Sequence, residues 1–330
     1  MEALLAAELP EGDGWQYEPK WDGFRCLARR DGGEVTLTSR SGKPLARYFP
    51  EVIELLRSVK DRDFLLDGEL IIPVGDVLSF EALQLRLHPA ESRVRKLAKE
   101  TPAELMLFDL LEAGDQHLTS LALAERRAAL ERFFARNAVP GLHLSPATRD
   151  RDTAIGWLKH SGGALDGVVA KRVDLDYRPG ERAMIKVKQQ RTADCVVGGF
   201  RYAEKKRQVG SLLLGLYDEH GLLHHVGFTS AIPAKERPQL TKDLEALVKP
   251  PGFTGNAPGG PSRWSSERTG QWEPLKPKLV VEVRYDQVTG RRFRHGAGFL
   301  RWRPDKAPKD CTFDQLAPEL SPSELKEFLN

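Results

Sequence analysis

Strand patterns run along the whole chain, and in its first 190 residues they are mixed with helical patterns. Alternating apolar and polar residues, together with short apolar runs, predict strands in this part at 15–19, 24–29, 34–39, 64–72, 105–111, 166–171 and 184–188. A turn at 31–33 joins the second and third of them as a hairpin. Apolar residues recur at helical spacing over 80–87 and 123–134. This mixture predicts an α+β domain that is rich in antiparallel strands.

The pattern changes after residue 190. Short strands are predicted at 195–200, 211–217, 223–228, 279–285 and 299–302, with one helix over 235–248 and a Pro/Gly/Ser-rich loop over 250–266. About five strands with one inserted helix fit an OB-type β-barrel, and the spacing also fits other small barrels. We therefore expect two domains, residues 1–190 and 191–330.

The composition is that of an ordinary globular protein of 330 residues, with 40% hydrophobic and 29% charged residues. The start of the chain lacks the basic head of a secretory signal, and no apolar stretch approaches membrane-spanning length. We expect a cytoplasmic protein with no membrane partner. Its three cysteines are far apart and have no zinc-ligand spacing, so neither a disulfide framework nor a structural metal is expected.

The charge is mildly basic, with a formal net value of +3 and a pI near 8.7. Such a total does not identify a partner, because nucleic-acid binding depends on clustered positive charge. Clusters do occur in the second part, at 205–207, at Arg291, Arg292 and Arg294, and at Arg301, Arg303 and Lys306. They are typical either of a nucleic-acid surface or of solvated loops.

Two common phosphate-binding motifs are missing. The sequence has neither GxxxxGK[ST] nor GxGxxG, so phosphate chemistry would need another arrangement. Instead, polar residues gather at the predicted strand ends of the first domain: Lys20, Asp22, Arg25, Ser39, Arg40, Asp67, Glu69, Asp109, Asp166, Lys171, Lys186 and Lys188. Alone, each has an ordinary interpretation as a surface turn, an exposed hairpin or the solvent side of an edge strand. In a strand, however, Lys186 and Lys188 share one face, where both ammonium groups could converge on a phosphate.

The order of these groups resembles that of the covalent nucleotidyltransferases, and specifically of bacterial ATP-dependent DNA ligases related to the ligase module of end-joining enzymes. EPKWDGFR (18–25) looks like motif I, SRSGK (39–43) like motif Ia, LLDGEL (65–70) like motif III, LFDLL (107–111) like motif IIIa, LDGVVAKR (165–172) like motif IV and MIKVKQQ (184–190) like motif V. DCVVGGF and GSLLLGLYD resemble the OB domain of that family, and FRHGAGFLRWRPDK (293–306) resembles its closing motif VI.

The resemblance implies a nucleotidyltransferase (ATP-grasp-like adenylation) domain followed by an OB-fold domain. It also implies ATP and Mg²⁺ or Mn²⁺ as cofactors and nicked double-stranded DNA as the substrate. Lys20 would attack the α-phosphorus of ATP and become a lysyl-AMP, and the surrounding cations would favour its neutral, nucleophilic form. AMP would then pass to the 5′-phosphate of a nick, and the 3′-hydroxyl would displace it to seal the strand.

The resemblance assigns the remaining roles position by position. Around the base, Glu18 would lie beside adenine, Phe108 would stack on it and Val169 would close the opposite face, although Phe108 could also be a core residue. Further nucleotide contacts would come from Arg25, Arg40, Lys171, Lys186 and Lys188, and from Glu69 at the ribose or the metal. Asp166 would stand near the metal; the family usually has glutamate there, so the shorter side chain would act through water. The predicted nucleic-acid contacts are Arg47, Lys205, Lys206, Arg294, Arg301 and Arg303.

Other functions remain open at this point. An RNA ligase or a capping guanylyltransferase uses a similar lysine motif, and a catalytically inactive relative could serve as a nucleic-acid-binding module. The surroundings KWDGFR and RWRPDK look more like those of DNA ligases. We expect a monomer with modest, salt-sensitive affinity for DNA and with repair proteins as partners. Asp109 is predicted to be structural, and no role is assigned to His224, His225 or His295.

Overall fold

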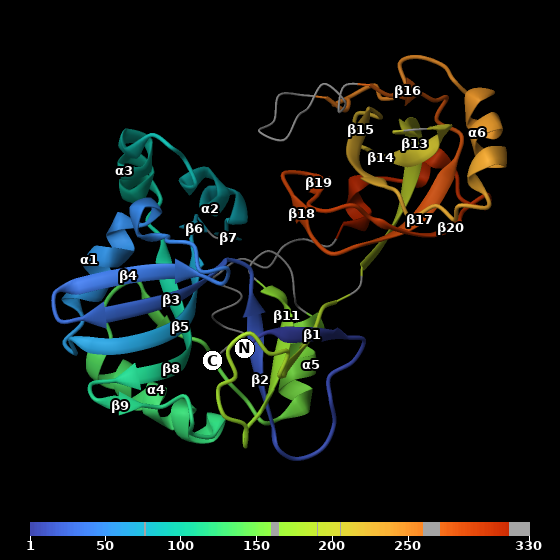
Figure 1. Ribbon diagram of the computed structural model, residues 1–330. Coiled ribbons are helices and arrows are strands. Elements are labelled where there is room, and N and C mark those ends of the chain that lie inside the picture. Colours follow the sequence, from blue (N-terminus) through green and yellow to red (C-terminus); the bar gives the residue numbers. More distant parts are fainter. Residues whose placement is uncertain (76, 160–164, 190, 205, 260–270, 317–330) are drawn as a thin grey trace. The chain divides into compact units, whose positions relative to one another are not determined.

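The computed structural model describes residues 1–75, 77–159, 165–189, 191–204, 206–259 and 271–316 (Figure 1). Their contacts divide into two compact units, one within Met1–Gln189 and the other within Gln190–Pro318. Within the described ranges, no helix is both long enough and apolar enough to cross a bilayer.

The larger sheet of the first unit contains the predicted hairpin. Its strands follow the order β10 (Leu142–Leu144), β8 (Glu104–Ala113), β5 (Asp63–Ile71), β3 (Phe24–Asp31) and β4 (Glu34–Ser39), and β9 (Gln116–His117) pairs with β8. The pairs β3–β4, β3–β5 and β5–β8 are antiparallel, whereas β10 runs parallel to β8. The prediction of an antiparallel-rich sheet is therefore confirmed.

Helices cover this sheet and complete its core. They are α1 (Pro50–Ser58), α2 (Phe80–Arg86), α3 (Glu91–Glu100) and α4 (Leu123–Asn137), with the short 3₁₀ turn η1 (Ala46–Tyr48) before α1 and the small hairpin β6 (Pro73–Val74) and β7 (Val77–Leu78) before α2. Leu56, Leu83 and Phe133 from three of these helices pack with Leu66 and Leu105 of the sheet, and all five are buried. Burial of such side chains contributes roughly 1.5–3 kcal/mol each.

Asp109 lies inside this core and is bound to a helix. Its two carboxylate oxygens accept hydrogen bonds from Nε and Nη2 of Arg126 on α4, at 2.9 and 3.1 Å. Both side chains are almost completely buried, with 5% and 1% of their surface exposed. The prediction that Asp109 is structural is confirmed, because its carboxylate is committed to this pair.

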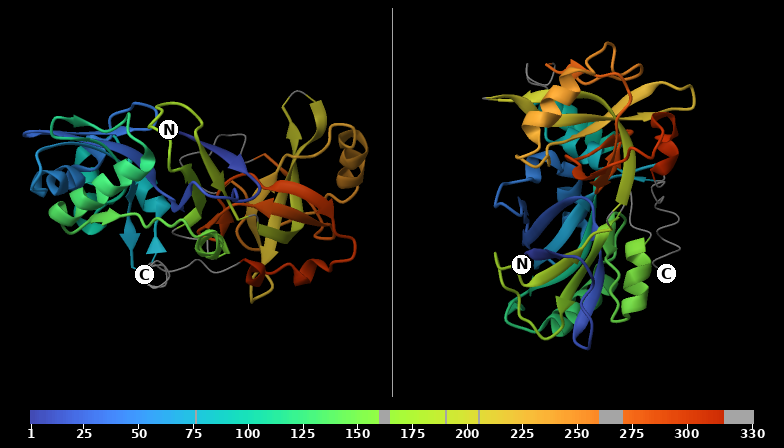
Figure 2. Two further views of the ribbon diagram at one scale, coloured as in Figure 1. Left: turned by 90° about the horizontal axis from the view of Figure 1, so that it is seen from below. Right: turned by 90° about the vertical axis from the view of Figure 1, so that its right-hand side faces the viewer.

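A smaller sheet stands beside the larger one, in the order β1 (Ala3–Ala6), β12 (Met184–Val187), β11 (Leu165–Arg172) and β2 (Trp15–Trp21). Helix α5 (Arg151–Lys159) lies along β2 and β11 (Figures 1 and 2). Trp157 of this helix packs with Tyr17 and Val168 of the sheet. Strand β1 was not predicted, because none of its residues is buried and its sequence shows no alternation; it forms by parallel pairing with β12.

The second unit is an OB-type barrel. Its strands follow the order β15 (Leu223–Thr229), β14 (Lys206–Tyr217), β13 (Arg191–Ala203), β17 (Val280–Tyr285) and β20 (Gly298–Trp302). In addition, β16 (Glu273–Pro274) pairs with β13, and β18 (Val288–Thr289) pairs with β19 (Arg292–Phe293). Helix α6 (Arg237–Glu245) packs on β14, and two short 3₁₀ turns, η3 (Pro308–Asp310) and η4 (Phe313–Gln315), follow β20. The predicted strands and helix are confirmed, but α6 is shorter than expected, and β13 and β14 are longer, because β13 pairs with β17 from Arg191 onward and with β14 as far as Ala203. The last part of the predicted loop, from 260, lies outside the described residues.

His225 on β15 makes the stability of this unit sensitive to acid. The residue is 5% exposed, and burial together with Arg292 and Arg201 lowers its pKa to about 3. An unfolded histidine has a pKa of about 6.5. The unfolded chain therefore takes up the proton first, so the stability contributed by neutral His225 is complete above about pH 6.5 and is lost as the pH falls toward 3.

We expect this histidine to add a slope of up to about 1.4 kcal/mol per pH unit to the unfolding free energy between roughly pH 6 and 4. Urea titrations at several pH values measure it, and His225→Asn should flatten the slope. His220 is a matched control, since 76% of its side chain is exposed and His220→Asn should leave the slope unchanged. An unaltered slope in His225→Asn would refute the prediction.

Candidate active site

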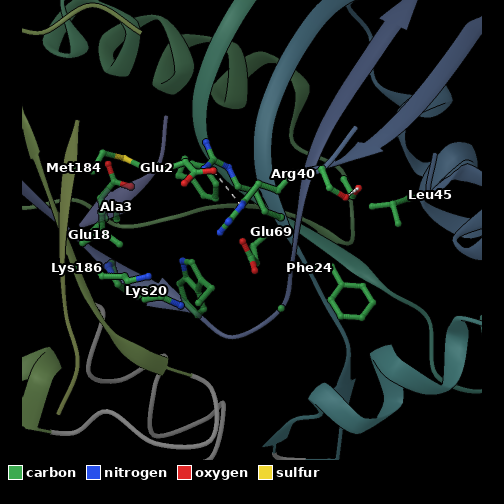
Figure 3. A pocket seen from close by; sticks show the side chains of 18 of the residues that line it. Glu2, Ala3, Glu18, Lys20, Phe24, Arg40, Leu45, Glu69, Met184 and Lys186 are labelled. Carbon is green, nitrogen blue, oxygen red and sulfur yellow. Dashed lines mark hydrogen bonds and ion pairs between the residues drawn. The ribbon is translucent and has the colours of Figure 1, made fainter. Parts of the chain in front are cut away.

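A cavity of about 1180 Å³ lies between the two sheets of the first unit (Figure 3). Most of the nucleotide-site residues predicted from the sequence line it: Glu18, Lys20, Arg25, Arg40, Glu69, Phe108, Val169, Lys171 and Lys186, with Arg47 from the predicted nucleic-acid set. Asp166 and Lys188 do not line the cavity, but both are bound to the cluster around Lys20. The structure thus brings residues that are far apart in the sequence to one place.

Lys20 is the penultimate residue of β2 and is held by a carboxylate. Its Nζ lies 2.6 Å from Oδ2 of Asp166, and Nζ of Lys188 lies 2.9 Å from the same oxygen. The Asp166 side chain is 8% exposed, so the two ammonium groups share a nearly buried acceptor. Figure 3 shows Lys20 and Lys186 reaching from the smaller sheet, with Glu69 across the cavity. The predicted neutrality of the Lys20 amine stays a prediction.

The glycine after Lys20 is required by a close approach of two segments. A Cβ atom at Gly23 would lie 2.1 Å from the carbonyl oxygen of Leu70 and 2.8 Å from Cγ of Glu69. Any side chain there would push the turn between β2 and β3 away from β5. Gly23 therefore keeps the strand that carries Lys20 close to the strand that carries Glu69.

Glu18 and Lys171 form a buried ion pair on the same sheet. Nζ of Lys171 lies 2.6 Å from Oε2 of Glu18, and Gln16 Nε2 donates a hydrogen bond to Oε1 at 2.8 Å. The ammonium group of Lys171 also stands 4.9 Å from the centroid of the Phe108 ring. Both carboxylate oxygens of Glu18 are thus occupied, and Lys171 is fixed between this carboxylate and the aromatic ring.

Val169 occupies the centre of the smaller sheet. It pairs with Glu18 of β2 on one side and with Lys186 of β12 on the other. Burial, with Lys20 and Lys188 nearby, lowers the pKa of Lys186. The register of the three strands therefore places Val169 between Glu18 and Lys186 at the wall of the cavity.

Arg25 is held rigidly by a partner that the sequence did not reveal. Its guanidinium donates through Nε and Nη2 to the two oxygens of Asp67 at 3.0 and 2.6 Å, and Tyr177 donates to the same carboxylate at 2.8 Å. Nη1 donates to the carbonyl oxygen of Met1. Burial alone would lower the pKa of Arg25, but Asp67 raises it above its ordinary value. Its predicted contact with a phosphate stays a prediction.

The sequence did not identify the two residues that hold Arg25, Asp67 and Tyr177, or the part of the cavity wall formed by residues 2–5. Asp67 appeared only as part of a strand end, and Tyr177 fell in a turn-rich stretch without a motif. Residues 2–5 line the cavity because β1 pairs with β12, and Glu2 Oε1 lies 3.4 Å from Nε of Arg40. Only the charge of Asp67 beside Glu69 could have indicated a partner for Arg25.

Glu69 faces the cavity from β5. Burial raises its pKa to about 8, although Lys20 and Arg25 act in the opposite direction. Its carboxylate lies across the cavity from Lys20, whereas the carboxylate of Asp166 is bound to Lys20 itself. No group of three or more His, Cys, Asp or Glu side chains with metal-ligand geometry occurs among the described residues. Two carboxylates suit Mg²⁺ or Mn²⁺, because Mg²⁺ is usually bound by one or two carboxylates with substrate phosphates and water.

The outer edge of the cavity is basic. Arg40 is 66% exposed, and Arg47 donates to the carbonyl oxygen of Pro89 at 3.0 Å while its guanidinium lies 4.9 Å from the Tyr48 ring. Lys43 lines the same edge. Three cations at the rim would attract an anionic polymer.

The remaining predicted nucleic-acid contacts lie in the second unit. Arg301 is 64% exposed and bound to Glu282 at 2.6 Å, and Arg294 donates to the side chain of Gln287. Arg303 is only 18% exposed and is held by Asp194 and Asp305. Lys206 starts β14 and is exposed, whereas Lys205 lies outside the described residues. Their contacts with DNA stay predictions, and Arg303 would have to exchange a carboxylate for a phosphate.

Comparisons with known proteins agree with this architecture. The family described as "ATP dependent DNA ligase domain" matches residues 5–188, and "ATP dependent DNA ligase C terminal region" matches residues 205–306. A solved chain from work titled "DNA binding with a minimal scaffold: Structure-function analysis of Lig E DNA ligases" shares the fold, with a TM-score of 0.54 and 19% identity over 92% of this chain and 100% of that chain.

Several curated relatives align along most of the chain. DNA ligase C2 of Mycolicibacterium smegmatis is 49% identical over 92% of this chain and 90% of its own length. DNA ligase C of Mycobacterium tuberculosis is 45% identical over 93% of this chain and 90% of its own length. Multifunctional non-homologous end joining protein LigD of Mycobacterium bovis is 31% identical over 90% of this chain and 37% of its own length. With a ligase family matched in each part and identities of this size, the chain belongs to the ATP-dependent DNA ligase family.

Proposed function

We propose that Lys20 is the nucleophile of this ATP-dependent DNA ligase and receives AMP from ATP as a lysyl-AMP. The observation that carries the proposal is the placement of Lys20, Lys186 and Glu69 around one cavity. An amine can attack a phosphorus atom only where the charge that develops on the phosphate oxygens is stabilised. Lys186, with Lys188 beside Asp166, supplies positive charge at the attacking amine.

The same cavity offers a place for the base. We assign Phe108 and Val169 to the two faces of the base, and we assign a further contact with the nucleotide to Lys171, whose ammonium group is held over the Phe108 ring at 4.9 Å. Glu18 would act mainly by positioning Lys171, since both of its carboxylate oxygens are already occupied.

Glu69 and Asp166 are the residues that would hold a magnesium or manganese ion. When bound, such an ion would supply positive charge against the phosphate oxygens. Asp166 has a second task, because it binds the ammonium groups of Lys20 and Lys188 at 2.6 and 2.9 Å. An incoming phosphate would compete with Asp166 for these two cations.

The proposed substrate is nicked duplex DNA, and the proposed setting is DNA repair. The relative named for non-homologous end joining, and the basic rim formed by Arg40, Lys43 and Arg47, support both parts. Binding would rest on backbone phosphates and would weaken as salt rises. The same proposal describes a cytoplasmic monomer that works with repair proteins.

A labelling experiment tests the proposed function. The protein is incubated with α-phosphate-labelled ATP or GTP and a divalent metal, and the adduct is then chased with nicked DNA or nicked RNA. Label from ATP that is discharged by nicked DNA is the expected result. Label from GTP alone would indicate capping chemistry, and discharge by RNA alone would indicate an RNA ligase.

Asp166→Ala should slow self-adenylation on the order of 100-fold, because it removes both the partner of Lys20 and a proposed metal ligand. Asp166→Glu should retain most of the activity, since the carboxylate is kept. The rate of labelling from ATP measures both. Asp174→Ala is the control, because that carboxylate is 58% exposed and bound only to Arg172 among the described contacts. Equal losses in Asp166→Ala and Asp174→Ala would contradict the assignment.

A further inference from the structure

The second unit has a pocket of its own, of about 430 Å³, that none of the roles above uses. It is lined by the tip of the β18–β19 hairpin, by two histidines of β15, by a neighbouring loop and by an aromatic ring: Gly290, Arg291, Arg292, His224, His225, Gly255, Asn256, Ala257 and Phe313. None of these lining residues is acidic. The pocket therefore combines two guanidinium groups with no carboxylate of its own.

The hydrogen bonds of Arg292, His225 and His224 determine which groups in the pocket wall donate and which accept. Arg292 can only donate, so its contact of 2.9 Å with Nδ1 of His225 makes that nitrogen an acceptor. His225 is then neutral with its proton on Nε2, a buried atom that meets no acceptor in hydrogen-bond geometry. His224 accepts from the backbone N–H of Asn256 and pairs with Asp218 at 2.7 Å, which satisfies both of its nitrogens. The excess of donors over acceptors in this pocket favours an anionic ligand.

The hairpin tip is held in a conformation that exposes the two arginines. Thr289 pairs with Arg292, which leaves Gly290 and Arg291 as a two-residue turn, and both have positive φ values, 55° and 65°. Glycine adopts such a conformation freely, whereas an arginine there is strained by about 1 kcal/mol or more. The Arg291 guanidinium lies 4.2 Å from the centre of the Phe313 ring, a contact that fixes its direction. The turn thus presents adjacent, oriented guanidinium groups.

We propose that this pocket binds a phosphate of the DNA backbone, with Arg291 and Arg292 as the contacting residues and His225 as the residue that positions Arg292. The proposal rests on DNA as the substrate of the proposed function. Guanidinium groups bind phosphate oxygens through paired hydrogen bonds, and such backbone contacts set position rather than sequence preference. The site would add a fixed anchor in the OB-type unit to the basic rim of the first unit.

Binding of the full-length protein to a labelled nicked duplex, measured at several salt concentrations, tests the proposal. Arg292→Gln should weaken binding roughly fivefold near 0.15 M salt and should reduce the slope of log K against log salt by about 0.9, the value for one lost phosphate contact. Lys242→Gln is the matched control, because it removes one exposed charge from α6 of the same unit and should change neither quantity by as much. Self-adenylation by ATP without DNA should be unchanged in both variants.

The outcomes separate this site from the function on which it depends. Loss of binding in Arg292→Gln with intact self-adenylation supports the site. Wild-type affinity and slope in Arg292→Gln, or an equal loss in Lys242→Gln, would overturn it. Inorganic phosphate is the last ligand to be tested. If inorganic phosphate protects the second unit against thermal unfolding as effectively as the duplex does at equal phosphate concentration, the pocket binds a free anion and not DNA. Failure of self-adenylation in the wild type would instead count against the proposed function.

Discussion

Lys20→Ala is expected to form no detectable adenylate and to seal nicks at least about 1000-fold more slowly than the unchanged enzyme. The reason is chemical, because alanine has no lone pair with which to form a bond to phosphorus. Lys20→Arg should fail as well, since a guanidinium remains protonated. Labelling with ATP and a gel-based sealing assay measure the two losses separately.

The same variant offers an internal control. If a nick that already carries AMP on its 5′-phosphate is supplied, Lys20→Ala should still join it at a measurable rate, because the last step needs no new bond to Lys20. Lys96→Ala, an exposed surface change on α3, should behave like the unchanged enzyme in every assay. Undiminished adenylation in Lys20→Ala would show that another residue carries the nucleotide.

Arg126→Leu is expected to reduce the unfolding free energy of the first unit by about 3–5 kcal/mol, because it leaves the carboxylate of Asp109 buried without its cation. Arg126 also donates to the carbonyl oxygens of Leu121 and Leu175, which would lose their partner. Burial already raises the pKa of Asp109, so the variant should take up a proton there. Urea unfolding of the variant and of the unchanged protein measures the loss.

Two comparisons show whether the buried pair is responsible. Arg136→Leu lies on the same helix, but its ion pair with Asp61 is 61% and 34% exposed, so its cost should stay below about 1 kcal/mol. The double variant Asp109→Leu/Arg126→Leu should recover part of the stability, because no unpaired charge remains. A loss in Arg126→Leu no larger than that in Arg136→Leu would contradict the account.

Much of the fold could be predicted from the sequence, because its strands and helices have clear periods. The hairpin of β3 and β4, the buried strands β5 and β8 and the barrel strands lie close to their predicted positions. Strand β1 could not be predicted, since Leu4 and Leu5 are 51% and 62% exposed and only pairing with β12 defines it. Its absence from the prediction also hid the part of the cavity that residues 2–5 line.

The sequence predicted which residues meet at the site but not the ion pairs that they form. Motif order placed Lys20, Glu69, Lys171 and Lys186 together, and the cavity contains all four. The sequence could not show which charges neutralise one another, because partners such as Asp67 for Arg25 and Asp166 for Lys20 are distant in the chain. Pair formation depends on distances of a few ångströms, which motif spacing does not specify.

The ion pairs change the electrostatic surroundings of Lys20, the proposed nucleophile. Lys20 does not lie among cations alone, because Asp166 stands between it and Lys188. A nucleotide phosphate would therefore enter a cluster whose charges are already partly balanced. Its binding would have to replace Asp166 as the partner of these lysines, which would make the proposed step sensitive to the carboxylate at position 166.

Mapping the adenylate on the chain tests most directly whether Lys20 carries the AMP. The protein is incubated with ATP and a divalent metal, digested, and its AMP-bearing peptide is sequenced by mass spectrometry before and after addition of nicked DNA. AMP should be attached to Lys20 and should disappear when nicked DNA is added. AMP on another residue, or sealing of nicks without any adduct at Lys20, would contradict the assignment of Lys20 as the nucleophile.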